Sequence, residues 1–246
     1  MIAIIPARGG SKGIPRKNVK TLGGIPLIAH TINAAKESEC IDEIIVTTDD
    51  EEIASVAREY GASVPFMRPD YLAQDGSLAV DVYIHAVEWL NEHREKKIEK
   101  FMVLLPTTPF RTSNSIDGAY GFFINHGAST LIAVKEAPIP PGWYMKMDDK
   151  NVLNNCRFEC GKEVQNRQNS SKYYIPCGAI YILDFELLKT KRTYYCDNTV
   201  GYLLSNKEAV DIDSIEDFEY AEYCYGKSTK EQSICGWNSD RQYTGA

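Results

Sequence analysis

Short continuous apolar runs recur along the first part of the chain. Residues 2–6 (IAIIP) and 100–106 (KFMVLLP) are runs of this kind that end at a proline. Residues 43–50 (EIIVTTDD) and 129–135 (STLIAVK) repeat the pattern. Short runs that are rich in β-branched residues and end at breakers or polar residues predict strands buried on both faces.

Amphipathic stretches separate these runs and predict helices. We expect helices over residues 26–38, 51–60, about 77–94 and near 114–126. Pro26 suits a first helical turn, because an N–H group at that position would lack a helical partner in any case. Asp50 can cap the second of these helices and Gly61 can end it. Residues 62–69 predict a short extended segment.

The amino-acid composition of the chain changes at about residue 136. Residues 136–176 are rich in Pro, Asn and charged residues, and they contain too many aromatic residues for simple disorder. We expect an insertion with hairpins there, after which the sheet resumes with a strand at 177–184. The elements expected after it are a helix near 185–190, a strand at 200–205, a helix over 214–226 and an irregular polar segment at 227–246.

Strands that alternate with amphipathic helices indicate an α/β fold, with a Rossmann-like, mostly parallel sheet covered by helices on both faces. We divide the chain into an α/β domain (1–135 and 177–226), an inserted subdomain (136–176) and a polar C-terminal tail (227–246). Ligands of such sheets bind beyond the carboxyl ends of the strands. The segments ARGGSKGIPRKN, TTDD and PTTPFRT should therefore meet at one edge.

Composition narrows the class of protein. Of 246 residues, 43% are hydrophobic, which is enough for a sizeable core. The apolar runs are too short for a membrane span, and the first residues make a poor leader peptide, so we expect a cytoplasmic protein. A formal net charge of −7 speaks against nucleic acid as a partner. Seven cysteines without a C-x-x-C pair favour reduced thiols over a zinc site.

Positive charge is concentrated in the loop after the first strand. No Asp or Glu precedes Glu37. Five basic residues lie between positions 8 and 20: Arg8, Lys12, Arg16, Lys17 and Lys20. A solvated surface usually mixes both signs of charge, so this concentration favours an anion site.

The loop ARGGSKGIPRKN differs from two familiar phosphate-binding motifs. It lacks the G-x-x-x-x-G-K-[ST] pattern of a P-loop, and Gly10 with Gly13 gives only part of a dinucleotide fingerprint. It does offer backbone N–H groups exposed by glycine, the hydroxyl of Ser11, the guanidinium of Arg8 and several ammonium groups. This set suits a triphosphate.

A pair of carboxylates lies far from this loop, in the segment VDIDS. In extended backbone, Asp211 and Asp213 point to one side while Ile212 points to the other. Two carboxylates on one face suit Mg²⁺, which also takes phosphate oxygens. The alternative is that Asp213 or Ser214 merely caps the next helix. A triphosphate loop and a carboxylate pair together suggest nucleotidyl transfer.

These motifs resemble those of the acylneuraminate cytidylyltransferases, the CMP-sialic acid synthetase family. The first loop matches the family pattern A-R-x-x-S-K-G-x-P-x-K-N, whereas related enzymes for the sugar acid Kdo carry S-x-R-L-P. IIVTTDD, RP at 68 and 69, LLPTTPFRT, GAIYI and VDIDS follow in the family order. The resemblance covers about residues 1–225 and implies a fold of the nucleotide-diphospho-sugar transferase type.

The resemblance also implies an activity and a set of residues for it. CMP would pass from CTP to the anomeric hydroxyl of a nonulosonic acid, a nine-carbon 2-keto sugar acid, with release of pyrophosphate. The nucleotide-binding residues would be Arg8, Gly10, Ser11, Lys17, Asn18 and Arg68. Arg8, Lys17 and Asp211 would act in catalysis, and Asp211 and Asp213 would hold Mg²⁺. The family further implies a homodimer in which the inserted subdomain crosses to the partner.

On the sugar side the resemblance points to Leu105, Arg167, Tyr181, Tyr194 and Tyr195. Arg167 is a candidate partner for the sugar carboxylate. Tyr194 and Tyr195 would line the sugar pocket, of the same or of the partner subunit. A role as buried core residues is equally consistent with the sequence at both positions.

Three departures from the family pattern fall on the sugar side. Leu105 replaces a glutamine that can bond the sugar, IPC at 175–177 replaces R-P-N, and Trp143 stands in for a lysine. A pocket that bonds a hydroxyl discriminates strongly against its absence. We therefore hypothesise a less polar sugar, a deoxy or diacetamido nonulosonate such as legionaminate or pseudaminate. The alternatives are transfer to Kdo and a non-catalytic nucleotide-binding homologue.

Overall fold

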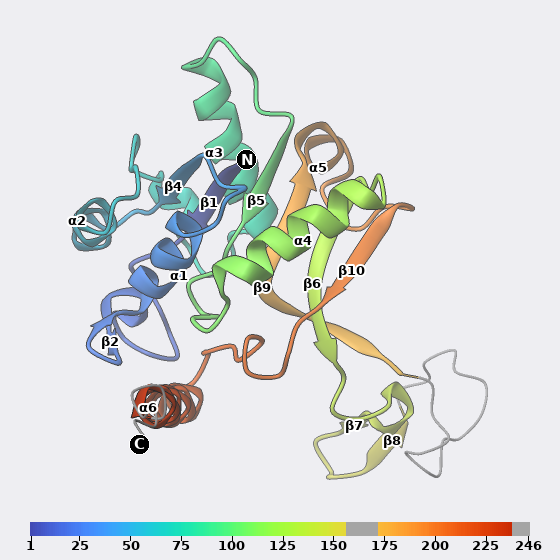
Figure 1. Ribbon diagram of the computed structural model, residues 1–246. Coiled ribbons are helices and arrows are strands. Elements are labelled where there is room, and N and C mark those ends of the chain that lie inside the picture. The colour runs from blue at the N-terminus through green and yellow to red at the C-terminus, as the bar shows by residue number, and fades with distance from the viewer. Residues whose placement is uncertain (156–171, 238–246) are drawn as a thin grey trace, which may run out of the picture.

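The computed structural model describes residues 1–155 and 172–237 (Figure 1). A six-stranded sheet forms the centre of this described part, in the order β10-β6-β9-β5-β1-β4. Its strands are β1 (Ile2–Pro6), β4 (Glu43–Thr47), β5 (Lys100–Val103), β6 (Thr130–Glu136), β9 (Tyr174–Asp184) and β10 (Thr199–Leu203). β9 is antiparallel to both neighbours and the other pairings are parallel, so the predicted mostly parallel sheet is confirmed.

Helices cover both faces of the sheet. One face packs against α1 (Leu27–Lys36), α2 (Glu51–Glu59) and α4 (Ser113–Asn125), and the other against α3 (Ala79–Glu92) and α5 (Phe185–Lys191). Figure 1 shows α1 and α4 in front of the strands. Along β1, Ile4 and Ile5 are both fully buried, in opposite cores. A strand buried on both faces has no polar side to alternate, and for this reason it reads as a continuous apolar run.

The predicted elements of the first 135 residues are confirmed with small shifts at their ends. Asp50 caps α2 by accepting hydrogen bonds from the N–H groups of Glu52 and Ile53, at 2.9 and 3.0 Å. Gly61 follows that helix with φ of +95°, a conformation that favours glycine. The expected extended segment at 62–69 forms one isolated bridge, between Ser63 and Ile45.

The insertion expected at 136–176 contains a short 3₁₀ turn, Pro141–Trp143, and a hairpin of β7 (Met145–Met147) and β8 (Leu153–Asn155). β9 begins at Tyr174, three residues before the predicted start, because its ladder with β6 continues to the pair Tyr174 and Glu136. In Figure 1 the hairpin stands away from the sheet, at the lower end where the carboxyl ends of the parallel strands lie. The division of the chain into a domain, an insertion and a tail stays a prediction.

The last helix corrects one expectation. α6 spans Ile215–Trp237, so residues 227–237 are helical and their predicted irregular structure is wrong. Polarity alone had suggested a loose segment. However, the stretch KSTKEQSIC contains no proline or glycine and several good helix formers, so the helix continues through it.

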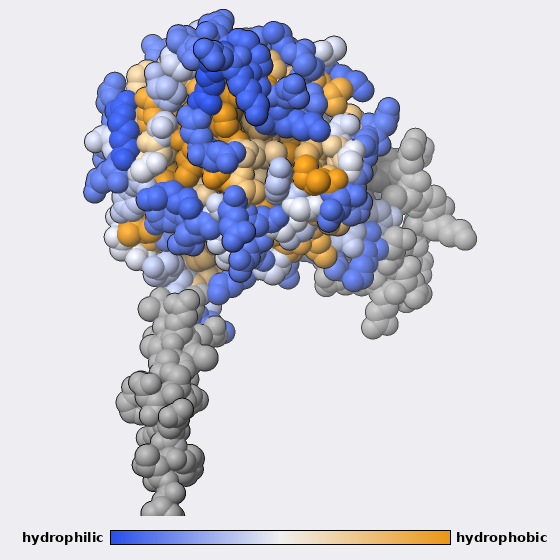
Figure 2. Space-filling model, turned by 45° about the horizontal axis from the view of Figure 1, so that its top comes forward, coloured by the Kyte–Doolittle hydropathy of each residue, from blue (hydrophilic) through white to orange (hydrophobic). Residues whose placement is uncertain are grey.

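No helix in the described part of the chain has both the length and the apolar content that a bilayer crossing requires. Figure 2 shows one face of the molecule, on which hydrophobic residues gather in patches bordered by hydrophilic ones.

Candidate active site

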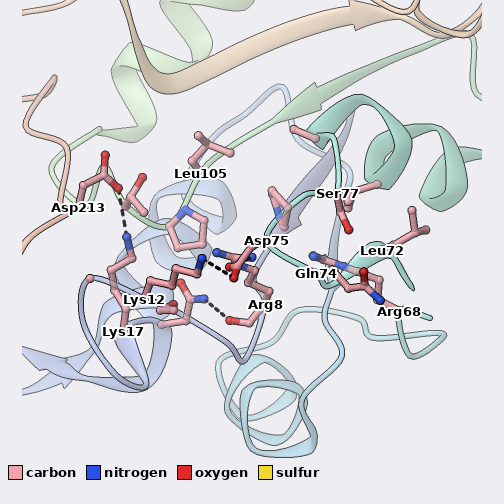
Figure 3. Close-up of a pocket in the computed structure, with 18 of the residues that line it drawn as sticks. Arg8, Lys12, Lys17, Arg68, Leu72, Gln74, Asp75, Ser77, Leu105 and Asp213 are labelled. Atoms are coloured by element: carbon pink, nitrogen blue, oxygen red, sulfur yellow. Dashed lines mark hydrogen bonds and ion pairs between the residues drawn. The ribbon is translucent and has the colours of Figure 1, made fainter. Parts of the chain in front are cut away.

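A cavity of about 460 Å³ opens beyond the carboxyl ends of β1 and β5 (Figure 3). Its wall combines the first loop, the segment after Arg68 and the loop after β5. The charged side chains that line it are Arg8, Lys12, Lys17, Arg68, Asp75 and Asp213. Segments far apart in the sequence therefore place four cations and two carboxylates around one space.

The first loop is held in shape by polar contacts of its own. The buried side chain of Asn18 donates to the backbone oxygen of Arg8 at 2.9 Å, which closes the loop on itself. The N–H of Gly9 donates to the carboxylate of Asp49 at 3.0 Å. Arg16, in the left-handed region at φ of 59°, turns away from the cavity and pairs with Asp50 at 2.6 Å. Asp49 and Asp50 thus shape and support the loop.

The carboxylate segment lies directly against this loop. The Nζ of Lys17 donates to the backbone oxygen of Ile212 at 2.8 Å and pairs with Asp213 at 3.3 Å. The approach is so close that a Cβ atom at Gly13 would lie 2.2 Å from the backbone oxygen of Asp213. Glycine at position 13 is therefore required by packing against the carboxylate segment.

A small apolar core fixes the carboxylate segment in place. Ile212 is fully buried with Ile14 of the first loop, Leu22 and Phe218 of α6. The N–H of Ile212 also donates to the backbone oxygen of Thr107 at 2.9 Å. The side chain of Ile212 thus packs the first loop against α6, and its backbone N–H bonds to the segment after β5.

Capping of α6 does not account for the two carboxylates. The Oγ of Ser214 accepts from the N–H of Asp217 at 3.2 Å, as a cap does. The carboxylate of Asp217 in turn accepts from the N–H groups of Asp213 and Ser214, at 3.0 and 2.8 Å. Ser214 and Asp217 therefore complete the start of the helix, which leaves the carboxylates of Asp211 and Asp213 for another role.

Asp211 is the most unusual acid of the site. Burial, followed by the nearby charge of Asp213, raises its pKa, while a hydrogen bond with Thr107 and the charge of Lys17 oppose the rise. Its Oδ1 is buried and has no hydrogen-bond partner in the described residues. A carboxylate in this position favours the approach of a positive group. Asp211 borders a neighbouring cavity of about 660 Å³, while Asp213 borders the first.

Arg68 forms part of the cavity floor. It is buried, and its guanidinium donates to the side chain and the backbone oxygen of Thr47 at the end of β4. Burial lowers its pKa to about 10, so it stays protonated at neutral pH. Its backbone N–H donates to Thr48 at 2.7 Å, which fixes the start of the next segment.

Arg111 is a structural residue that the sequence analysis missed. It is almost fully buried and donates to the hydroxyl of Thr31 at 2.8 Å, to the backbone oxygen of Leu105 and to the hydroxyl of Thr108. Burial lowers its pKa to about 9. The loop that carries Leu105 into the cavity is therefore built around this guanidinium. The sequence contained Arg111 within LLPTTPFRT but gave no sign that it was buried.

Other lining residues that the sequence analysis did not single out include Gln74, Asp75, Ser77 and Tyr83. They follow the motif Arg68-Pro69 within sixteen residues, so the extended stretch after that motif was the signal that could have found them. Tyr83 is one of four rings that we call the tyrosine cluster: Tyr83, Tyr181, Tyr194 and Tyr195.

The tyrosine cluster lies on the α3 side of the sheet. The ring of Tyr194 lies 5.6 Å from that of Tyr181, 6.2 Å from that of Tyr83 and 6.4 Å from that of Tyr195, between centroids. Burial raises the pKa of Tyr181 and of Tyr194, whereas 58% of Tyr195 is exposed. Tyr194 is thus packed among other rings, and Tyr195 offers its surface to solvent.

Seven of the predicted site residues line the first cavity together: Arg8, Ser11, Lys17, Asn18, Arg68, Leu105 and Asp213. Five do not line it: Gly10, Asp211, Tyr181, Tyr194 and Tyr195. Gly10 is exposed and a Cβ there would meet open space. Arg167 lies outside the described residues.

Comparisons with known proteins agree on one chemistry. A family model described as cytidylyltransferase matches residues 2–93. The chain is 35% identical over 225 residues to a CMP-N,N'-diacetyllegionaminic acid synthase of Legionella pneumophila, covering 90% of this chain and 94% of the relative. It is 34% identical over 222 residues to an N-acylneuraminate cytidylyltransferase of Escherichia coli, where the match covers 90% of this chain but only 51% of that longer protein.

Among solved structures, a CMP:2-keto-3-deoxy-manno-octonic acid synthetase complexed with CTP superposes with a TM-score of 0.67. The match covers 92% of this chain and 98% of that one, at 13% identity. At this identity the likeness concerns the fold alone, and it confirms the predicted fold type.

Proposed function

The chain belongs to the nonulosonate cytidylyltransferases, the CMP-sialic acid synthetase family, and we propose that its own sugar substrate is a diacetamido nonulosonic acid such as N,N'-diacetyllegionaminate. It is a nucleotidyltransferase that transfers CMP from CTP to a nonulosonic acid. We assign this activity to the cavity that Arg8 lines because Lys17 contacts Ile212 and Asp213 there. This contact joins the basic loop to the carboxylate segment.

For the nucleotide we propose a division of labour along the cavity. Arg8, Lys12 and Lys17 neutralise the triphosphate, with help from the hydroxyl of Ser11 and the backbone around Gly10. Arg68, near the far end of the cavity, lies toward the cytidine together with Asn18. When the anomeric hydroxyl of the sugar attacks the α-phosphorus, pyrophosphate leaves, and Arg8 and Lys17 stabilise the charge that develops.

We propose that Asp211 and Asp213 hold Mg²⁺. The donor set fits this ion, because Mg²⁺ needs only one or two carboxylates and takes its other ligands from water and phosphate. The buried oxygen of Asp211 without a partner in the described chain, and its raised pKa, both favour a cation beside it. The ion would supply charge neutralisation for the triphosphate. Chelation of metal should therefore abolish turnover, and added Mg²⁺ should restore it.

The sugar proposal rests on the wall around Leu105. This side chain lines the cavity beside Pro106, where a sialic acid synthetase would present a glutamine amide. An apolar wall favours a sugar that presents a methyl or acetamido group over one that presents a hydroxyl. Tyr181, Tyr194 and Tyr195 would border the same sugar, and Arg167 would meet its carboxylate.

We further propose that the protein works as a homodimer in the cytoplasm, where CTP is available. The β7–β8 hairpin carries exposed apolar side chains, with Met147 64% and Leu153 61% exposed. Such side chains are a suitable surface for a partner subunit. Sedimentation velocity should give a dimer, and Met147→Asp with Leu153→Asp should give a monomer.

The direct test of the activity is pyrophosphate release from CTP and N,N'-diacetyllegionaminate with Mg²⁺. We expect release with CTP, and at most a few per cent of that rate with UTP or ATP. Release with Kdo but with none of the nonulosonates would overturn the assignment of the sugar class. CTP binding without release from any sugar acid would point to a non-catalytic homologue.

A further inference from the structure

The carboxylate of Asp75 occupies the middle of the cavity described above. Its Oδ1 lies 3.0 Å from the Nη1 of Arg8, and its Oδ2 lies 2.7 Å from the Nζ of Lys12. Figure 3 shows this carboxylate beside both basic side chains, with a dashed line to Lys12. Each oxygen of the Asp75 carboxylate thus pairs with one cation, as two oxygens of a bound phosphate group would.

The cations that Asp75 contacts are those that the triphosphate needs. Arg8 and Lys12 come from the first loop, and both line the cavity. The hydrogen bond from Lys12, and then the charges of Lys12 and Arg8, hold the pKa of Asp75 below its usual range. At neutral pH, a full negative charge therefore lies where the substrate must place its own.

Building on the proposed function, we propose that Asp75 is an internal counter-anion, which competes with the phosphates of CTP and with pyrophosphate for Arg8 and Lys12. The nucleotide must displace this carboxylate when it enters. The carboxylate returns to the cations when pyrophosphate leaves. Asp75 thereby sets the affinity of the site for polyphosphates.

The segment that carries Asp75 has room to move. It runs from the 3₁₀ turn Asp70–Leu72 to the start of α3, and a second cavity of about 560 Å³ lies on its other side. Leu72, Gln74 and Ser77 line both cavities, so the segment forms a wall between them. The second cavity can receive the segment when a ligand takes the place of the carboxylate.

Both ends of this segment are anchored while its tip is not packed. At one end Arg68 is buried and bonded to Thr47, and at the other end α3 packs into the core. Gly76, next to Asp75, would meet no atom with an added Cβ. A short tip between fixed ends allows the carboxylate to swing without disturbing the fold.

The size of the effect follows from the exposure of the ion pairs. The side chain of Asp75 is 49% exposed and that of Lys12 is 76% exposed. Partly exposed pairs are each weak, so displacing two of them should reduce polyphosphate affinity by about threefold to tenfold. A ligand with several negative charges overcomes this competition, whereas a single weak anion does not.

The test is the affinity for CTP and for pyrophosphate alone, measured by titration calorimetry without the sugar. Asp75→Asn keeps the shape of the side chain and removes its charge. We expect it to bind both ligands about threefold to tenfold more tightly than the unmodified protein. The matched control is Asp70→Asn, which removes a charge from the same segment at a residue that makes no ion pair with the described residues; its affinities should stay unchanged.

Affinities of Asp75→Asn that are equal to or weaker than those of the unmodified protein would overturn the proposal. Weaker binding would make Asp75 a residue that positions Arg8 for the ligand. A failure of the proposed function would look different, because the protein would then bind pyrophosphate without preferring CTP to other nucleotides. The pyrophosphate titration would still decide the role of Asp75.

A double-mutant cycle separates direct competition from a general field effect. In a Lys12→Ala background, Asp75 keeps only its pair with Arg8, so Asp75→Asn should raise pyrophosphate affinity by a smaller factor, roughly twofold to threefold. An undiminished increase in that background would mean that the negative charge acts at a distance, and it would overturn the proposal of a displaced contact.

Discussion

The proposed phosphate end of the site (Arg8, Lys12, Lys17 and Asp213) and the proposed sugar end (Leu105 and the tyrosine cluster) are built in different ways. At the phosphate end, charged side chains from distant segments meet in ion pairs, and Lys17 also donates to the backbone oxygen of Ile212. At the sugar end, Leu105 lies on a loop built around Arg111, and the tyrosine rings pack on one another. In the function proposed above, the phosphate end serves the transfer of CMP from CTP, whereas the sugar end sets the choice of acceptor.

This difference implies that substitutions at the two ends should have different signatures. Changes at the phosphate end should reduce turnover with every sugar. Changes at the sugar end should alter the ratio between sugars while the use of CTP persists. The predictions below test this separation, from the largest expected effect to the smallest.

Removal of the Asp211 carboxylate should have the largest effect. Asp211→Ala is expected to lower kcat by about two to three orders of magnitude, the scale for loss of a charge-organising group in an active site. Folding should be intact, because Ile212 and not Asp211 packs into the small core. Steady-state pyrophosphate release and circular dichroism measure the two properties. Normal turnover with Mg²⁺ would reduce the pair to a structural role.

Arg8→Ala should slow the reaction by about a hundredfold, because one cation that meets the developing charge is lost. The matched control is Arg16→Ala in the same loop, since Arg16 pairs with Asp50 outside the cavity. That control should retain activity to within about threefold, the scale of a surface ion pair. Equal losses in the two variants would show that loop structure, not charge at the phosphate, carries the effect.

Leu105→Gln should change the preference for sugars. The amide would add a hydrogen-bonding group to the apolar wall, so the ratio of kcat/KM for N-acetylneuraminate to that for N,N'-diacetyllegionaminate should rise about tenfold. The KM for CTP should stay constant. Leu105→Met keeps the wall apolar and serves as the matched control. A ratio that does not change would separate Leu105 from sugar recognition.

Asp211 should also make stability depend on pH. Its pKa is raised in the folded state by burial, so its contribution to stability is present below its unfolded pKa, about 4, and is lost as pH rises through the folded value. In EDTA at pH 8, Asp211→Asn should therefore be more stable than the unmodified protein, by about 1 kcal/mol. The difference should vanish near pH 4.

Urea unfolding at the two pH values measures this difference. Added Mg²⁺ should stabilise the unmodified protein and not the variant, because only the former keeps both carboxylates. A variant that is less stable at pH 8 would contradict the account of Asp211 as a carboxylate whose buried Oδ1 has no partner in the described residues.

The local pattern of hydrophobic and polar residues is sufficient to predict much of the fold. The doubly buried strands were visible as continuous apolar runs, and the cap at Asp50 and the end at Gly61 follow from the chemistry of single residues. The length of β9 was not visible, because it depends on pairing with β6. The extension of α6 does not follow from polarity, because a polar stretch without proline or glycine can form a helix as well as a loop.

The same distinction applies to the site. The basic loop and the D-x-D pair could be predicted because each is compact in sequence. Their contact through Gly13 and Lys17, the burial of Arg111 and the ion pairs of Asp75 could not, because each joins residues that only the tertiary fold brings together. A sequence indicates which charged groups are present, and the fold decides which of them meet.

The most direct test of the central claim is a comparison of kcat/KM for a panel of acid sugars, with CTP and Mg²⁺ and with pyrophosphate release as the readout. The account predicts release with nonulosonates, and a value for N,N'-diacetyllegionaminate at least about tenfold higher than that for N-acetylneuraminate. A clear preference for N-acetylneuraminate would contradict the account of an apolar sugar end, and turnover of Kdo alone would contradict the sugar class itself.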